Sequence, residues 1–125
     1  MKAMLKKEDL FVNFSNHPSG AWAEEQITAA LTYGSRIVDL PFPPVDPAID
    51  EAELDRIAEK KTEEIMSMKP AAVMCQGEFG LSFSVIKRLL AAGVTVLYAC
   101  SERKVHTDGN VKTIQFDFVR FRKYF

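Results

Sequence analysis

His17 is the residue of this sequence best suited to proton transfer, because an imidazole gains and loses a proton near neutral pH. It stands in a polar segment, residues 15–20 (SNHPSG), that directly follows an apolar run. A histidine in such a place either acts as a general acid or base or holds the loop through hydrogen bonds. The residue pattern leaves both roles open.

Two further polar segments, residues 76–79 (QGEF) and 101–103 (SER), also follow apolar runs. Arg103 can grip a phosphate with its planar guanidinium group. Glu78 can accept a hydrogen bond from a ribose hydroxyl or cap a helix. The segments after residues 14 and 75 are expected to open onto helix N-termini, which favour anions. The candidate ligand-binding residues are Ser15, Asn16, His17, Gln76, Gly77, Glu78, Phe79, Ser101 and Arg103.

No motif of a common cofactor or metal site accompanies these residues. The sequence contains neither GxGxxG nor GxxxxGK[ST], which argues against a dinucleotide or ATP site of the usual kind. It also lacks CxxC and HExxH, and the two histidines, His17 and His106, stand apart. We therefore expect no cofactor and no metal.

Four apolar runs and three helical patterns must position the candidate residues. The predicted strands cover residues 10–14, 36–40, 71–75 and 94–100, and the fourth is expected to stop at Ser101. The predicted helices lie within residues 19–34, 50–68 and 80–93. Ser19 is expected to cap the first helix, and Asp50 with Glu53 the second. Residues 104–121 predict a β-hairpin with its turn at 108–110.

This alternation predicts an α/β fold, a three-layer Rossmann-like sandwich with a mainly parallel sheet and a C-terminal β-hairpin. Ligands of such folds bind outside the carboxyl ends of the strands, where the strand order reverses. With the strand order 2-1-3-4, residues 15–17 face residues 76–78 across that crevice.

Length and composition limit the class of protein. The 125 residues are expected to form one domain, 1–125, with a composition typical of globular chains. Sixteen Lys and Arg against seventeen Asp and Glu give a net charge of −1, so we expect no extended DNA or RNA binding. Residues 1–10 lack the apolar stretch of a signal peptide, and no run is long enough to span a membrane. We therefore expect a cytoplasmic protein without a membrane partner. Cys75 and Cys100 are expected to be free, buried thiols.

Residues 116–125 (FDFVRFRKYF) interleave aromatic and basic side chains. Binders of single-stranded nucleic acid use this pattern, but basic residues also protect an edge strand from pairing. Apolar side chains fall on both faces of the predicted strand, with Ile114, Phe116 and Phe118 on one face and Val119, Phe121 and Phe125 on the other. A homodimer contact is the expected explanation of this apolar excess.

Four phrases of the sequence resemble those of small CRISPR-associated proteins of type III antiviral defense systems. They are residues 11–19 (FVNFSNHPS), 38–43 (VDLPFP), 75–79 (CQGEF) and 99–103 (ACSER). The proteins they resemble are stand-alone relatives of the CRISPR-associated Rossmann-fold (CARF) domain. The resemblance extends from residue 10 to the end of the chain.

The resemblance implies a homodimer that binds a cyclic oligoadenylate second messenger across its two-fold axis, with ring-nuclease activity in some members. It implies that residues 15–17 and 76–79 line the ligand and that Arg103 is a charge partner. His17 and Arg103 are then the candidate catalytic residues. Ring cleavage of this kind needs no metal, because a ribose 2′-hydroxyl attacks the neighbouring phosphorus in line.

Two other classes of function stay open. A nucleoside- or sugar-processing enzyme would bury Glu78 as its nucleophile or base, with Asp39 or Asp46 as a partner. A non-catalytic sensor or assembly protein would bind its partner through the apolar hairpin.

Overall fold

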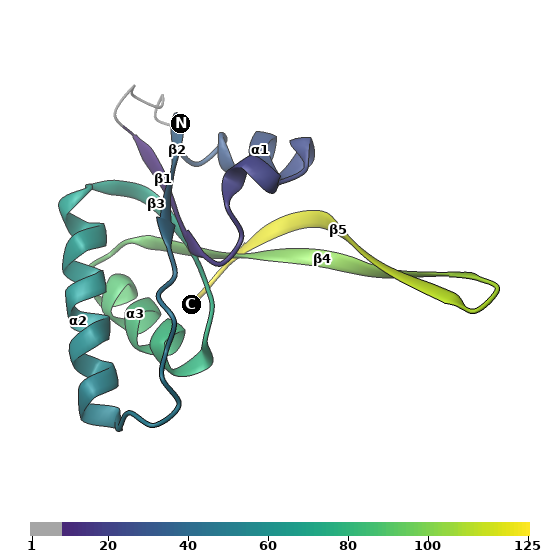
Figure 1. Cartoon of the computed structure of the whole chain (residues 1–125). Helices are drawn as coiled ribbons and strands as arrows, with labels where there is room; N and C mark the ends of the chain where they lie inside the picture. The colour runs from purple at the N-terminus through teal and green to yellow at the C-terminus, as the bar shows by residue number, and fades with distance from the viewer. Residues whose placement is uncertain (1–8) are drawn as a thin grey trace.

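The computed structural model describes residues 9–125, which form an α/β fold with one mixed five-stranded sheet and three α-helices (Figure 1). The strands are β1 (Leu10–Ser15), β2 (Arg36–Pro41), β3 (Pro70–Gln76), β4 (Thr95–Asp108) and β5 (Val111–Lys123). The helices are α1 (Glu24–Ala30), α2 (Glu51–Ser67) and α3 (Phe79–Ala91), and a 3-10 turn covers Ser19–Ala21. Most of residues 1–10, on which the signal-peptide expectation rests, lie outside the described part. Within that part, no helix combines the length and the apolar character needed to cross a membrane.

The sheet has the strand order β2-β1-β3-β4-β5, which confirms the order expected for the first four strands. These four pair in parallel, and β5 returns antiparallel to β4. The order reverses between β1 and β3, and their last residues, Ser15 and Gln76, are register partners. The chain segments that follow β1 and β3 therefore leave the same edge of the sheet side by side.

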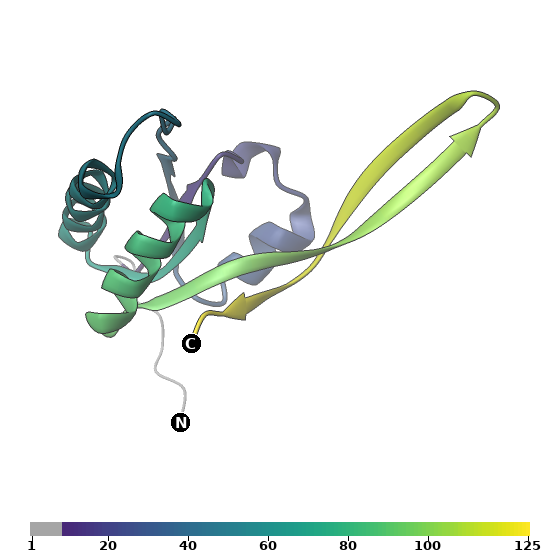
Figure 2. The same cartoon turned by 90° about the horizontal axis from the view of Figure 1, so that it is seen from below.

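Apolar side chains are buried on both faces of the sheet, which explains why β1 and β3 show little alternation of polar and apolar residues. On one face, residues of α2 and α3 pack over Phe14 and Val73. On the other face, α1 and the end of β5 pack over Phe11 and Met74, with Phe121 in the middle of the cluster. Figure 2 shows α2 and α3 on one side of the sheet and α1 on the other.

The prediction that the fourth strand stops at Ser101 is wrong. β4 continues to Asp108 and pairs with β5, and the two strands leave the body as a long ribbon (Figures 1 and 2). Polar residues after Cys100 did not end the strand, because β5 satisfies their backbone N–H and C=O groups. The arm is defined here as the eight residue pairs from Ser101–Phe118 to Asp108–Val111. Its turn contains Gly109, whose φ of +61° suits glycine.

A β-bulge separates the arm from the rest of the sheet. Cys100 pairs with Arg120 whereas Ser101 pairs with Phe118, so Val119 has no direct partner on β4. The bulge brings Phe118 and Phe121 into one cluster, with ring centroids 5.0 Å apart. The expected placement of Phe118 and Phe121 on opposite faces is therefore wrong.

The first helix begins later than predicted. Ser19 is not its N-cap, because α1 begins at Glu24. The backbone N–H and the hydroxyl of Ser19 instead both donate to the carboxylate of Asp39. The start of α2 is confirmed, since the Asp50 side chain accepts from the backbone N–H of Glu53 at 2.9 Å.

The two cysteines differ in burial. Cys75 lies in the core as expected, whereas Cys100 is half-buried, and both are free. Burial raises the pKa of the Cys75 thiol to about 12, so that thiol stays protonated at neutral pH.

Candidate functional site

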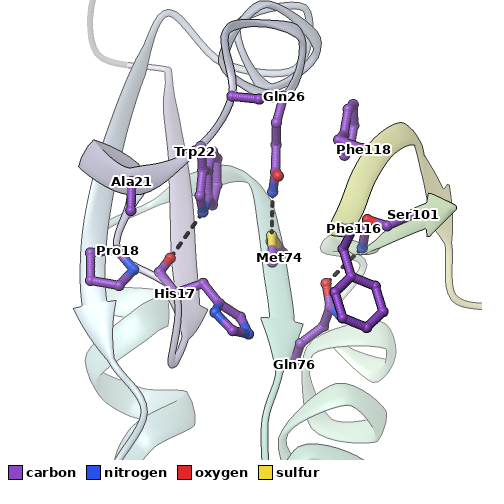
Figure 3. Close-up of a pocket in the computed structure, with 12 residues that line it drawn as sticks. His17, Pro18, Ala21, Trp22, Gln26, Met74, Gln76, Ser101, Phe116 and Phe118 are labelled. Atoms are coloured by element: carbon purple, nitrogen blue, oxygen red, sulfur yellow. Dashed lines mark hydrogen bonds between the residues drawn. The ribbon is translucent and has the colours of Figure 1, made fainter. Parts of the chain in front are cut away.

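A cavity of about 610 Å³ opens at the carboxyl edge of the sheet, on the face that α1 covers (Figure 3). Its walls are the loop after β1 with the start of α1, the end of β3, and the base of the arm. The lining residues are His17, Pro18, Ala21, Trp22, Ala23, Gln26, Met74, Gln76, Ala99, Ser101, Phe116 and Phe118. The cavity thus lies where the strand order reverses, and its volume is that of a small-molecule site.

Asn13, which is 1% exposed, holds the loop after β1 in place. Its Nδ2 donates to the backbone oxygen of His17 at 2.8 Å and to the carboxylate of Asp39 at 3.0 Å. Its Oδ1 accepts from the hydroxyl of Ser15 at 2.6 Å. The indole N–H of Trp22 donates to the same His17 oxygen at 2.9 Å. A buried amide and an indole therefore fix the backbone of this loop.

The imidazole of His17 points into the cavity, on the side where Gln76 lies (Figure 3). Among residues 9–125 it has no hydrogen-bond partner, because the loop is fastened through the backbone oxygen of His17 and not through its ring. The loop-holding role considered for the imidazole is therefore not found. The ring is available to a ligand.

Two glutamine side chains bring amide groups to the cavity. Oε1 of Gln76 accepts from the backbone N–H of Ala99 at 2.6 Å, which leaves its Nε2 to donate. Nε2 of Gln26 lies 3.8 Å from the sulfur of Met74, which leaves its Oε1 to accept. Aromatic rings stand on both sides, from Trp22 on the body and from the arm. The cavity can therefore hold a flat heteroaromatic ring and hydrogen-bond its edge.

The cavity lining is nearly neutral. No lysine, arginine or carboxylate is among its lining residues, and His17 is its one histidine. Arg103, the predicted charge partner, is exposed on the arm, where it pairs with Phe116 across the two strands, and it does not line the cavity. Ser101 does line the cavity, although as part of a strand and not of a loop.

Gly77, Glu78 and Phe79, all predicted to bind the ligand, do not line the cavity. A Cβ atom on Gly77 would lie 2.5 Å from the ring of Phe42, so glycine is needed for close packing there. Glu78 is exposed and caps α3, with its carboxylate accepting from the backbone N–H of Leu81 at 2.7 Å. The capping interpretation of Glu78 is confirmed. Phe79 is 93% exposed.

Ser15 and Asn16 line a smaller neighbouring cavity of about 270 Å³, beside Asp39. The carboxylates of Asp39 and Asp46 both accept from nearby backbone N–H groups. Since Glu78 is also exposed, the burial and pairing that a Glu78-based nucleoside enzyme requires are not found.

Sequence reasoning missed several residues of the site. Asn13 left one signal, as a lone polar residue inside an apolar run. Trp22 packs on the core and also lines the cavity. Nothing local in the sequence brings Gln26, Phe116 and Phe118 together, because their approach depends on the bulge and on the course of the arm.

Residues 9–122 match the model of a family described as the uncharacterized protein MJ1673 family. The match covers nearly the whole chain and includes every residue that lines the larger cavity. No curated protein matches the chain.

Proposed function

We propose that this chain, which belongs to the uncharacterized protein MJ1673 family, is a CRISPR-associated protein that binds a cyclic oligoadenylate in the cavity beside His17. The observation that carries the proposal is the cavity itself. It lies at the reversal of the strand order and combines aromatic rings, two amides and a free imidazole. The class of ligand comes from the resemblance to CARF proteins.

The polar groups of the cavity suit an adenine base. Adenine has an exocyclic amine that donates and ring nitrogens that accept, and the free atoms of Gln26 and Gln76 are an acceptor and a donor. Trp22 can stack on the face of the base, as aromatic side chains do in sites for single-stranded nucleic acid. The neutral lining takes the base, and the phosphates lie toward the opening.

The proposal includes a Rossmann-like sandwich and a homodimer. The strand order and the helices on both faces support the first. Exposed apolar side chains on the arm, such as Val105 and Ile114, support the second, because a partner would cover them. A ring with an even number of identical nucleotides matches a two-fold axis, about which each copy presents the same cavity.

Ring cleavage at this site would use the His17 imidazole as a general base. The imidazole takes the proton of a ribose 2′-hydroxyl, and the 2′-oxygen attacks the neighbouring phosphorus in line. The bond from phosphorus to the 5′-oxygen breaks, and the 5′-oxygen takes a proton from water. The products are a 2′,3′-cyclic phosphate and a free 5′-hydroxyl group.

The test is thermal unfolding in EDTA with cyclic tri-, tetra- and hexa-adenylate, compared with linear oligoadenylate and with AMP, a single nucleotide that can occupy one cavity only. A ligand at 100 times its Kd that binds the native state alone adds about 2.7 kcal/mol to the free energy of unfolding. Chromatography of the same mixtures detects linear products. Products with a shift indicate a ring nuclease, and a shift without products indicates a sensor.

Two aromatic variants locate the binding. Trp22→Leu changes the cavity lining and is expected to reduce the shift, whereas Phe79→Leu changes an exposed ring outside the cavity and is expected to leave it unchanged. The proposal is overturned if no ring raises the melting temperature. An assembly role of the arm would then be favoured.

A further inference from the structure

Beyond Phe118 at its base, which packs against Phe121, the arm has no packing partner among residues 9–125. Residues 101–116 are all exposed, and the ribbon extends away from the body (Figures 1 and 2). A two-stranded ribbon without a third element is marginally stable in water. Phe116, at its base, is 67% exposed, and Val105 and Ile114, which pair across the strands further out, are about half exposed.

The two faces of the arm differ in charge. Side chains alternate along each strand, and directly paired residues share a face. Every acidic residue of the arm, Glu102, Asp108 and Asp117, lies on one face, where Lys104 pairs with Asp117 at 2.9 Å. The other face has no acidic residue and presents Arg103, Val105, Lys112, Ile114, Phe116 and Phe118.

The acid-free face continues the wall of the cavity, because its Phe116 and Phe118 line that cavity. The opposite rim is apolar and exposed, with Pro18, Ala21 and Ala23. Next to this rim, α1 begins with two exposed carboxylates, Glu24 and Glu25. Such a rim complements a strand that carries apolar side chains between two cations.

The length of the arm and the symmetry of a dimer indicate that the arm of a second copy of the chain covers that rim. Eight residue pairs span roughly 26 Å, which is about the width of a small domain. In a two-fold dimer the same contact forms twice, arm on body and body on arm. Packing of one acid-free arm face on another would place cations of one copy against cations of the other, so the acidic rim of the body is the better match.

We propose that the arm of each copy lies across the cavity of the other, so that Arg103 of the partner subunit contacts the phosphate of the bound nucleotide. The inference rests on the proposed function for its ligand. The partner's arm would supply the cation that the cavity lining lacks. This arrangement also explains why Arg103, which was predicted to bind phosphate, lies outside the cavity of its own chain. A complete site then needs two copies.

Trp22 allows a direct test, because it is the single tryptophan of the chain and lines the cavity. AMP, which fits one cavity, is the probe, and quenching of Trp22 fluorescence reports binding. Arg103→Ala is expected to weaken AMP binding about tenfold, since a charge-assisted hydrogen bond to phosphate is lost. Lys104→Ala, on the opposite face of the arm, is expected to leave it unchanged.

Mixed dimers then decide which copy supplies Arg103. The Arg103→Ala chain is refolded with a large excess of Trp22→Phe chain, whose arm is intact and whose cavity gives no tryptophan signal. Quenching at the wild-type affinity is expected, because each reporting cavity now receives an intact arm. An excess of chain with both substitutions is the control and is expected to restore nothing. Affinity that stays at the Arg103→Ala value overturns the inference and leaves the proposed function standing.

Sedimentation without ligand separates failure of the inference from failure of the function. The wild-type chain is expected to be a dimer. Lys112→Glu is expected to weaken it, and Glu24→Lys with Glu25→Lys is expected to restore it. A monomeric wild-type chain, or a dimer that Lys112→Glu leaves unchanged, overturns the inference whether or not a nucleotide binds. Absence of quenching by AMP and by every ring, with the dimer and its charge reversal as expected, overturns the proposed function and the phosphate contact but supports the arm contact.

Discussion

The cavity has two walls of opposite construction, the loop after β1 and the arm. The loop is short, and its backbone is fixed by the buried side chain of Asn13 and by the indole of Trp22. The arm is long and is held by its own backbone ladder, with one ion pair between Lys104 and Asp117. One wall of the cavity is therefore fixed by buried hydrogen bonds, whereas the other depends on backbone pairing and on the packing of Phe118 at the base of the arm.

The largest difference in the free energy of unfolding is expected between the alanine variants of two phenylalanines, one in the body and one in the arm. Phe11 is fully buried, and its ring centroid lies 6.2 Å from that of Trp22 and 5.4 Å from that of Phe121. Phe11→Ala is expected to lower the free energy of unfolding by about 3–5 kcal/mol, because a cavity replaces the ring. Phe116→Ala, on the exposed arm, is expected to change it by less than about 0.5 kcal/mol. Urea unfolding in the Lys112→Glu background, in which the dimer is expected to be weakened, measures both, and equal losses would mean that the arm belongs to the cooperative core.

A smaller difference in the free energy of unfolding is expected between the alanine variants of two amide side chains, Asn13 and Gln115. Asn13→Ala leaves the His17 backbone oxygen and the Ser15 hydroxyl short of a partner, at a cost of about 1–3 kcal/mol. Gln115→Ala removes the arm hydrogen bond from Gln115 to Asp117, which is exposed, and is expected to cost under about 0.5 kcal/mol. Thermal unfolding compares the two variants. If Asn13→Ala is as mild as Gln115→Ala, the loop after β1 is not held as described.

The smallest difference is expected between two carboxylates, Asp55 in the body and Asp117 in the arm, in how they change stability at acid pH. The guanidinium of Arg88, and next the hydroxyl of Ser84, lower the pKa of Asp55 below its ordinary 3.8. Stability from this group is therefore present above pH 3.8 and is lost as pH falls through the lowered native pKa. Lys104 and Gln115 lower the pKa of Asp117 in the same direction. Both carboxylates are partly exposed, so the effects are small.

The position of each carboxylate predicts different readouts. Asp55→Asn is expected to flatten the acid side of the global unfolding profile, because Asp55 joins α2 to α3. Asp117→Asn is expected to change hydrogen exchange of arm amides only, since the arm opens before the body unfolds. An effect of Asp117→Asn on global unfolding equal to that of Asp55→Asn would contradict the separation of arm and body.

The same contrast explains what sequence patterns could predict. The body follows local rules: apolar runs became β1 and β3, Asp50 capped α2, and the strand order placed Ser15 beside Gln76. Burial selects for such patterns, so they can be recognised without a structure. The predicted hairpin over residues 104–121, with its turn at 108–110, is confirmed, but the continuity of its first strand with β4 was not predicted, because residues 101–103 carry no hydrophobic pattern. The aromatic wall of the cavity depends on that continuation and was therefore missed.

The bulge at Val119 also determines how the arm can change in length. Phe116 and Phe118 stand at the base, so residues inserted at the turn near Gly109 would extend the tip by roughly 3.3 Å per pair and leave the cavity wall intact. One residue inserted into each strand between the bulge and Arg103 would instead rotate every outer side chain to the opposite face. We therefore expect changes of arm length to be tolerated at the tip, and at the base only in steps of two residues per strand.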